Sequence, residues 1–132
     1  MKISVNNPCP CGSQMKYKLC CQKYHKGAHP KDALTLMKSR YTAYAVGDAK
    51  YISKTTHPKN SEYNEDKKEW QKSIENFCKE NSFLGLEIES YADVGEYSFV
   101  TFKAKFADGI LQEKSRFIKY EGLWLYLDGE IK

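Results

Sequence analysis

The sequence predicts an α+β protein in which a small cysteine-rich module precedes a domain of helices and an antiparallel sheet. Four of the five cysteines lie between residues 9 and 21. Apolar residues then recur at helical spacing between residues 32 and 78, and from residue 83 onward they alternate with polar residues. Helices followed by strands are the order typical of α+β folds. We therefore predict a metal-binding module over residues 1–29 and a second domain over residues 30–132.

The overall composition narrows the class of protein. The chain has 132 residues, of which 41% are apolar and 29% charged, as expected of a folded domain. It has no apolar run near the roughly 20 residues that span a bilayer, which argues against a membrane span. Its start, MKISVNNPCPCGS, lacks the apolar stretch of a secretory signal, so we expect a cytoplasmic protein.

The positive charge of the chain is concentrated at its start. The net charge is +4, yet residues 1–31 hold six lysines and no acidic residue, while residues 32–132 hold 15 basic and 17 acidic side chains. A positive patch favours anionic partners such as RNA, an acidic protein surface or phospholipid headgroups. The alternative is a solvated lysine-rich surface that only keeps the protein in solution.

The cysteine cluster predicts one structural zinc ion. Its members are Cys9, Cys11, Cys20 and Cys21. The first pair is too close along the chain for a relaxed disulfide, and the second pair is vicinal. Four thiolates can instead converge on a tetrahedral zinc at about 2.3 Å each, which leaves no open position for water or substrate. His25 and His29 are alternative ligands, but we expect them at the surface because the cysteines already supply four.

Three helices are expected in the first half of the second domain. The first begins at Asp32 or just before it, ends at Gly47, and repeats apolar residues every three or four positions: Leu34, Met37, Tyr41, Tyr44 and Ala45. Asp48 caps a second helix that runs to about residue 54. A third helix follows a charged loop over residues 59–68, and it presents one apolar face: Trp70, Ile74, Phe77 and Cys78. Cys78 is therefore expected to be a buried core thiol.

Four strands in an antiparallel meander are expected after the helices. Alternating apolar residues mark a first strand through Leu84, Leu86 and Ile88 and a second one over residues 100–106. Asp-Gly at 108–109 and Glu-Gly at 121–122 are hairpin signals, and they bound strands over residues 110–120 and 123–127. The strand over residues 110–120 is mixed on both faces, so its inward side stays unassigned.

Residues 8–21, PCPCGSQMKYKLCC, resemble the SEC-C motif, the short zinc-binding element found at the C-terminus of the translocation ATPase SecA. That motif is Cys-x-Cys, eight residues, then Cys followed by Cys or His, and this chain fits the spacing without a gap. Gln14 and Met15 depart from the Gly-Lys that usually continues the motif. The resemblance implies that the four cysteines hold zinc.

Nearly the whole chain resembles the YchJ family of small bacterial proteins. The stretches that carry the resemblance are LMKSRYTAYAVGDAKYISKTTHP and SRFIKYEGLWLYLDG, in addition to the SEC-C motif. The resemblance implies a nuclear-transport-factor-2-like fold, in which a curved sheet wraps around helices to form a cone with a cavity at its open end. The resemblance implies no particular activity, because none is established for that family.

Residues within the shared stretches are candidates for lining such a cavity: Arg40, Tyr41, His57, Arg116, Trp124 and Asp128. A histidine base that an aspartate orients, beside an arginine that holds charge, would support proton transfer on an anionic substrate. Each residue also has a structural alternative. His57 suits a cation at a helix end, the two arginines suit ion pairs, and Asp128 suits a turn with the glycine after it.

Three functions stay open at this point. The favoured one is an interaction or adaptor protein whose zinc module docks on a protein partner that is ribosome- or export-associated. The second is an enzyme or small-ligand binder that uses the cone cavity, and the third is a nucleic-acid binder that uses the lysine-rich module. The sequence leans away from an enzyme because no nucleophile lies near an activating base and no glycine-rich phosphate loop is present. A homodimer is a further open alternative.

Overall fold

A computed structural model gives the structure of the protein and describes residues 3–132. The described chain forms, in order, a 3-10 turn η1 (Tyr17–Leu19), helices α1 (Gln22–His25), α2 (Ala33–Val46), α3 (Ala49–Lys54) and α4 (Lys67–Glu80), and strands β1 (Phe83–Val94), β2 (Tyr97–Phe106), β3 (Gly109–Tyr120) and β4 (Leu123–Ile131). The strands form one antiparallel sheet in chain order. The predicted α+β architecture is confirmed.

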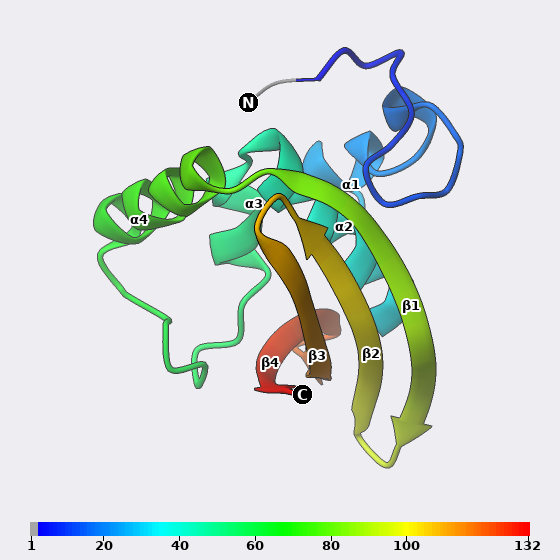
Figure 1. The fold of residues 1–132 in the computed structure, drawn as a ribbon. Coiled ribbons are helices and arrows are strands. Elements are labelled where there is room, and N and C mark those ends of the chain that lie inside the picture. Colours follow the sequence, from blue (N-terminus) through cyan, green and yellow to red (C-terminus); the bar gives the residue numbers. More distant parts are fainter. Residues whose placement is uncertain (1–2) are drawn as a thin grey trace.

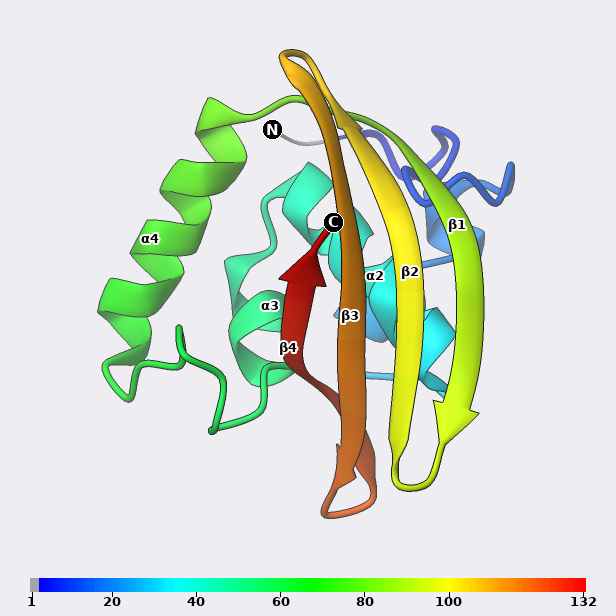
Figure 2. The ribbon, with the colours of Figure 1, turned by 60° about the horizontal axis from the view of Figure 1, so that its bottom comes forward.

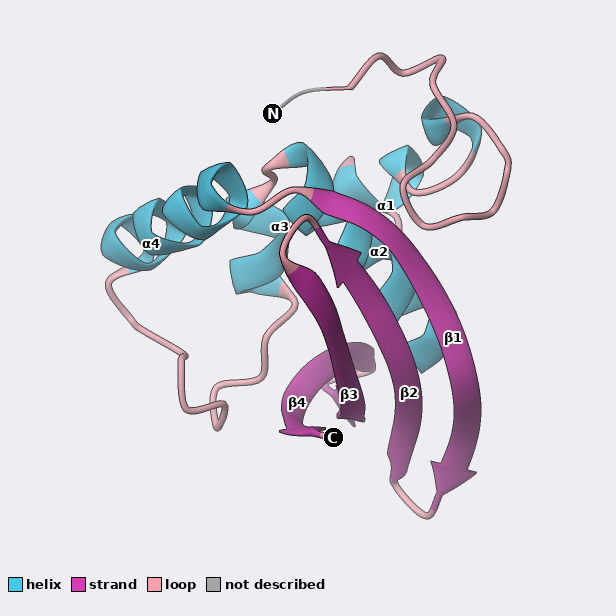
Figure 3. Ribbon diagram, in the orientation of Figure 1, coloured by secondary structure: helices cyan, strands magenta, loops and turns pink. Residues whose placement is uncertain are grey.

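The sheet curves around the helices, as Figure 1 shows. α2 contacts β1, β2 and β4 on the inner side of this curve, and α4 contacts α2 and α3. In the turned view of Figure 2, α4 stands beyond the β4 edge while α2 and α3 lie behind the strands. The segment before α1 is mostly loop and lies near α2 and β1 (Figure 3). Within residues 3–132, no helix is long and apolar enough to cross a membrane.

The helix ends follow the capping residues of the sequence. The side chains of Asp32, Asp48 and Asp66 each accept a hydrogen bond from the backbone N–H three residues further on, at 2.8, 3.1 and 3.2 Å. Gly47 ends α2 in the left-handed region with φ 81°. The predicted boundaries of α2 and α3 are thereby confirmed, and Asp66 fixes the start of α4.

α2 is buried on more than one side. Residues 39–43 are all buried, and Ser39, Thr42 and Ala43 are fully inaccessible. Five consecutive residues of a helix point around more than one full turn, so a single neighbouring layer cannot cover them all. The sheet covers one side of α2, and the cysteine module covers another. The apolar periodicity predicted only the first of these contacts, because Ser39 and Thr42 are polar.

α4 buries a narrower stripe than its sequence predicts. Trp70, Ile74 and Cys78 are buried at a spacing of four residues, and burial raises the pKa of the Cys78 thiol. The prediction that Phe77 shares this buried face is wrong, because its side chain is 44% exposed. Phe77 lies at the rim of the stripe, where its ring meets that of Phe83 at a centroid distance of 6.1 Å.

Bulges decide which strand residues face inward. In β1 the register shifts between Phe83 and Gly85, so Phe83 contacts the core and Leu84 is 65% exposed, contrary to the predicted alternation. In β2 the predicted alternation is confirmed, because Val100, Phe102 and Ala104 are buried and Phe106 packs against the core. In β3 the inward face, which the sequence leaves unassigned, carries the buried residues Ser115 and Phe117.

The segment after α3 pairs with the outer edge of β4. Thr56 forms a parallel bridge with Tyr126, whose backbone N–H donates to the carbonyl of Thr55 at 2.9 Å. The backbone N–H of His57 donates to the carbonyl of Tyr126 at 2.8 Å. These two backbone hydrogen bonds join the segment after α3 to the last strand.

Candidate functional site

Two tight turns bring the cysteines of the module together. The N–H of Cys9 donates to the carbonyl of Met15 at 2.8 Å, and the N–H of Gly12 donates to the carbonyl of Cys9 at 3.1 Å. Gly12 has φ +86°, a conformation that costs glycine little. η1 then returns the chain so that the second cysteine pair meets the first. All four sulfurs lie within 4.8 Å of one another.

The spacing of the sulfurs suits a metal ion. A tetrahedral ion with metal–sulfur bonds of 2.3 Å needs sulfurs about 3.8 Å apart. The Sγ atoms of Cys11 and Cys20 are 3.6 Å apart, whereas a disulfide bond is about 2.05 Å long. All five cysteines of the chain are free thiols. The cluster formed by the four cysteines of the motif can therefore bind a metal ion.

The sulfurs also influence the ionisation of one another. Hydrogen bonds from Cys11 and Cys21 lower the pKa of Cys9 far below its ordinary value. Contacts with Cys11 and Cys9 raise the pKa of Cys21. Ionisation of one thiol thus makes ionisation of its neighbour less favourable, because two negative charges so close together repel each other. A divalent cation at the centre supplies that compensation for all four sulfurs.

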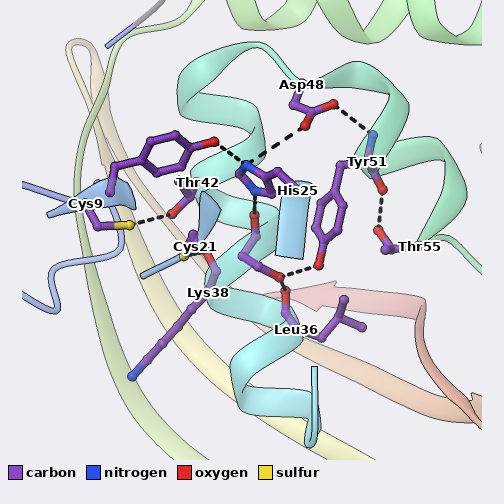
Figure 4. Close-up of polar contacts among 11 residues, drawn as sticks. Cys9, Cys21, His25, Leu36, Lys38, Thr42, Asp48, Tyr51 and Thr55 are labelled. Carbon is purple, nitrogen blue, oxygen red and sulfur yellow. Dashed lines mark hydrogen bonds and ion pairs between the residues drawn. The ribbon is translucent and has the colours of Figure 1, made fainter. Parts of the chain in front are cut away.

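Polar contacts tie the cluster to its surroundings. The Ser13 hydroxyl lies 3.1 Å from the Cys20 sulfur. The Thr42 hydroxyl of α2 lies 3.7 Å from the Cys9 sulfur, as Figure 4 shows. Such neighbours orient metal ligands and offset their charge. A residue of the second domain therefore takes part in the surroundings of the cluster.

His25 at the end of α1 is the main polar link between the module and α2. Its side chain is only 4% exposed. Nδ1 lies 2.7 Å from the Tyr17 hydroxyl, Nε2 lies 2.9 Å from the carbonyl oxygen of Ser39, and the ring lies 4.7 Å from that of Tyr51 (Figure 4). Because a carbonyl oxygen only accepts, Nε2 donates to Ser39 and, in the neutral ring, Nδ1 accepts from Tyr17. The prediction of a surface position is wrong for His25, whereas His29 is exposed.

A second candidate site is a cavity of about 870 Å³ between the inner face of the sheet and helices α2 and α4. Its wall is mostly aromatic: Tyr44, Trp70, Phe83, Phe102, Phe106, Phe117 and Tyr126 are among the lining residues. Of the six residues proposed for it from the sequence, Arg40, Tyr41 and Asp128 line it. The other three lie elsewhere.

Arg40 is buried at the wall of this cavity, with 7% of its surface exposed. Its Nη1 donates to the carbonyl of Ile52 at 3.2 Å and to the hydroxyls of Thr55 and Thr56 at 2.8 and 3.1 Å. Its Cζ lies 4.6 Å from the centre of the Tyr126 ring, a cation–π contact. The structural alternative of an ion pair is not realised, because Arg40 has no carboxylate partner within residues 3–132.

Arg116 and Asp128 pair with each other. Arg116 Nε and Nη2 donate to the two carboxylate oxygens of Asp128 at 3.0 and 2.7 Å, across β3 and β4. Both side chains are exposed, and the guanidinium lies over the ring of Tyr97 rather than over the core. The cross-strand alternative for Arg116 is therefore realised, and Asp128 lies in β4, not in a turn.

His57 and Trp124 lie apart from this pair. The Nδ1 of His57 accepts a hydrogen bond from the backbone N–H of Lys59 at 3.0 Å, and its ring meets that of Tyr120. Trp124 lines a separate pocket of about 100 Å³ near Tyr51. His57 thus lies apart from Arg116 and Asp128, and these three residues form no proton-transfer site.

The cavity is lined by three carboxylates that sequence reasoning missed, those of Glu62, Glu69 and Glu113. Glu113 Oε2 accepts from the Ser115 hydroxyl at 2.6 Å and from the Tyr126 hydroxyl at 3.0 Å. Burial raises the pKa of Tyr126, and the charge of Glu113 raises it further, so this hydroxyl stays a donor at neutral pH. An assignment of the inward face of residues 110–120 would have pointed to Glu113.

We expect Tyr41→Phe to raise the free energy of unfolding by about 1 kcal/mol, because a buried hydroxyl without a partner costs its desolvation. The Tyr41 hydroxyl is buried and has no hydrogen-bond partner within the described chain. The matched control is Tyr51→Phe, which removes a 2.7 Å bond to Ser39 and should be destabilising by about as much. Urea denaturation measures both, and equal losses in the two variants would contradict the prediction.

Family models match both parts of the chain. The model described as the YchJ middle NTF2-like domain matches residues 32–129, and the SEC-C motif matches residues 6–23. A UPF0225 protein of Streptomyces coelicolor is 38% identical over 127 residues, which cover 93% of this chain and 94% of that protein. A UPF0225 protein of Enterobacter is 38% identical over 128 residues, which cover 92% and 81% of the two chains.

Solved structures show the same arrangement. A SEC-C motif containing protein from Psychrobacter arcticus aligns with a TM-score of 0.80 at 29% identity and covers 97% of this chain and 84% of that one. A SEC-C motif containing protein from Rhodopseudomonas palustris aligns with a TM-score of 0.76 at 30% identity and covers 94% and 98%. An NTF-2 like protein of unknown function from Silicibacter pomeroyi, at 14% identity and a TM-score of 0.54, shares the fold.

Proposed function

The chain belongs to the YchJ family, with a SEC-C motif ahead of an NTF2-like domain, and from this premise we propose that it is a zinc-dependent adaptor that docks on a protein partner. Zinc is the ion that four thiolates in tetrahedral geometry favour. Free thiols suit a reducing compartment, so we place the adaptor in the cytoplasm. The zinc is structural, since four protein ligands complete its coordination.

The observation that carries the docking proposal is a set of exposed apolar side chains on the module. Its members are Val5, Met15 and Leu19, which are 40%, 49% and 59% exposed. The carbonyl of Val5 accepts from the N–H of Lys18 at 3.0 Å, which holds the segment before the cysteines against η1. Contiguous exposed apolar side chains with a polar rim are typical of interaction surfaces, and we propose that these three side chains form such a surface.

The charge near these apolar side chains indicates the chemistry of the partner. Lys16 and Lys18 are exposed beside them, and residues 1–31 contain no acidic side chain. A zinc ion with four thiolates carries a formal charge of −2, which the lysines more than offset. A protein surface with an apolar centre and an acidic rim is complementary to this arrangement.

Nucleic acid is the weaker candidate. Single-stranded nucleic acids bind proteins by stacking bases on exposed aromatic rings. In the module Tyr17 is 8% exposed, and Tyr24 is partly buried against the main core. The exposed residues of the module named above are apolar or basic instead: Val5, Met15, Lys16, Lys18 and Leu19. This favours a protein partner.

We expect Met15→Glu combined with Leu19→Glu to abolish capture of specific partners from a bacterial lysate treated with ribonuclease. The matched control is Val94→Glu, which alters a residue 58% exposed at the end of β1, whereas the Gly12 turn of the module lies against Leu86 near the start of that strand. Quantitative mass spectrometry would compare the variants at low and high salt, and binding should weaken with salt. Identical partner sets for both variants would contradict the adaptor function. Partners that vanish with ribonuclease alone would favour nucleic acid.

A further inference from the structure

We propose that the cavity between the sheet and helices α2 and α4 binds a small aromatic carboxylate, and that the carboxylate group of this ligand forms an ion pair with Arg40. This inference concerns a different part of the molecule from the docking surface and does not depend on it. The cavity of about 870 Å³ falls in the range of small-molecule sites, roughly 300–1,000 Å³. Three features of its wall define the ligand.

The first feature is a buried positive charge without a negative partner. Arg40 is 7% exposed, and its hydrogen bonds within the described chain all run from Nη1 to neutral oxygens. The Nε and Nη2 donors have no such bond. A buried guanidinium is costly unless it is paired, and the fork formed by these two nitrogens matches a carboxylate in geometry. A ligand carboxylate at this place would complete the pair.

The second feature is the aromatic wall. Phe83 and Phe106 meet edge to face at 5.1 Å, and Phe117 and Tyr126 meet at 5.7 Å. Tyr44, Trp70 and Phe102 are further aromatic residues of the lining. Rings of this kind contact a flat apolar body through both faces and edges. The body of the ligand is therefore aromatic rather than a polar chain such as a sugar.

The third feature is the acidic part of the wall, formed by Glu62, Glu69, Glu113 and Asp128, which limits the ligand to the one carboxylate that Arg40 can pair. Tyr126 connects Arg40 to one of these carboxylates, since its ring lies under Arg40 and its hydroxyl donates to Glu113 Oε2. Ser115 also donates to Oε2, whereas Oε1 accepts no bond from the described residues. Oε1 can accept a hydrogen bond from a ligand hydroxyl or amine. A second ligand carboxylate would meet the charge of Glu113 and be repelled.

Calorimetry and NMR titration of the full chain with three matched probes test this site. The probes are indoleacetate, indolelactate with an added hydroxyl donor, and the neutral amide indoleacetamide. We expect indoleacetate to bind about tenfold to a hundredfold more tightly than the amide, the range for one charge-assisted pair. Indolelactate should bind more tightly still. The NMR shifts should concentrate on the aromatic lining residues.

Two variants test whether Arg40 is the residue that binds the ligand carboxylate. Arg40→Gln should remove the preference for the acid over the amide. Lys114→Gln is the control, because Lys114 carries the same charge outside the cavity, where its Nζ lies 4.9 Å from the centre of the Phe99 ring, and it should leave both affinities unchanged. If Arg40→Gln fails to fold, the affinities of the unaltered protein for the acid and the amide still test the proposal. Equal affinity for acid and amide, or no binding of any probe at millimolar concentration, overturns the proposal.

Discussion

Removal of the metal should unfold the cysteine module and lower the melting temperature of the rest of the protein. Structural zinc contributes on the order of 10–16 kcal/mol to the folding of small modules. The buried cluster of this module consists of three of its cysteines and one other residue: Cys9, Cys11, Cys21 and Tyr17. The second domain should survive, because its own core includes α2, α4 and the sheet. It should nevertheless lose stability, since Ser39 and Tyr51 lie under the module and would become exposed.

Metal analysis and NMR spectroscopy of Cys20→Ser and of the unaltered protein check this result. The unaltered protein should contain one zinc per chain, and the variant should lose the dispersed signals of residues 3–29 while keeping those of the sheet. Cys78→Ser is the control, because Cys78 is a buried cysteine of α4 outside the cluster, and it should retain a full equivalent of zinc. Less than half an equivalent of zinc in the carefully purified, unaltered protein would count heavily against the site.

Substitution of His25 should have the second-largest effect. His25→Ala removes the hydrogen bonds to Tyr17 and Ser39, leaves their polar groups buried, and opens a void beside Tyr51. Together these losses should lower the free energy of unfolding by about 2–4 kcal/mol. Zinc content should stay at one equivalent, because His25 links the module to α2 rather than binding the ion.

His29→Ala is the control for this experiment, since His29 is exposed in the connection to α2. It should change the free energy of unfolding by less than about 0.5 kcal/mol. Urea denaturation and metal analysis of both variants provide the measurement. Loss of zinc from His25→Ala at full folding of the second domain would make His25 a ligand and refute the linking role.

The parts of this protein that the sequence predicted are those that depend on local spacing. The cysteine pairs converge because two short turns determine their positions, and Asp32, Gly47 and Asp48 set helix ends through contacts within one turn. Phe77 and Leu84 were assigned wrongly for a related reason. The exposure of Phe77 depends on the width of the buried stripe of α4, and that of Leu84 depends on the bulge in β1. A regular repeat of apolar residues describes neither.

The parts that sequence reasoning missed depend on contacts between distant segments. His25 is buried because α1 docks on α2, and nothing near His25 in the chain indicates this contact. Glu113 enters the cavity because the pleat of β3 turns it inward beside Tyr126, on a strand whose two faces look alike. Arg116 and Asp128 are paired by the register of β3 and β4, which the hairpin turn and a bulge determine together.

The backbone pairing of residues 55–57 with Tyr126 has a consequence for assembly. A free sheet edge is a template on which a strand from another molecule can align, and repeated pairing of this kind leads to fibres. Here Tyr126, near the middle of β4, already uses its outward N–H and C=O groups in hydrogen bonds with the segment after α3. Copies of this protein are thereby prevented from adding strand to strand at that edge, so any association there has to use side chains.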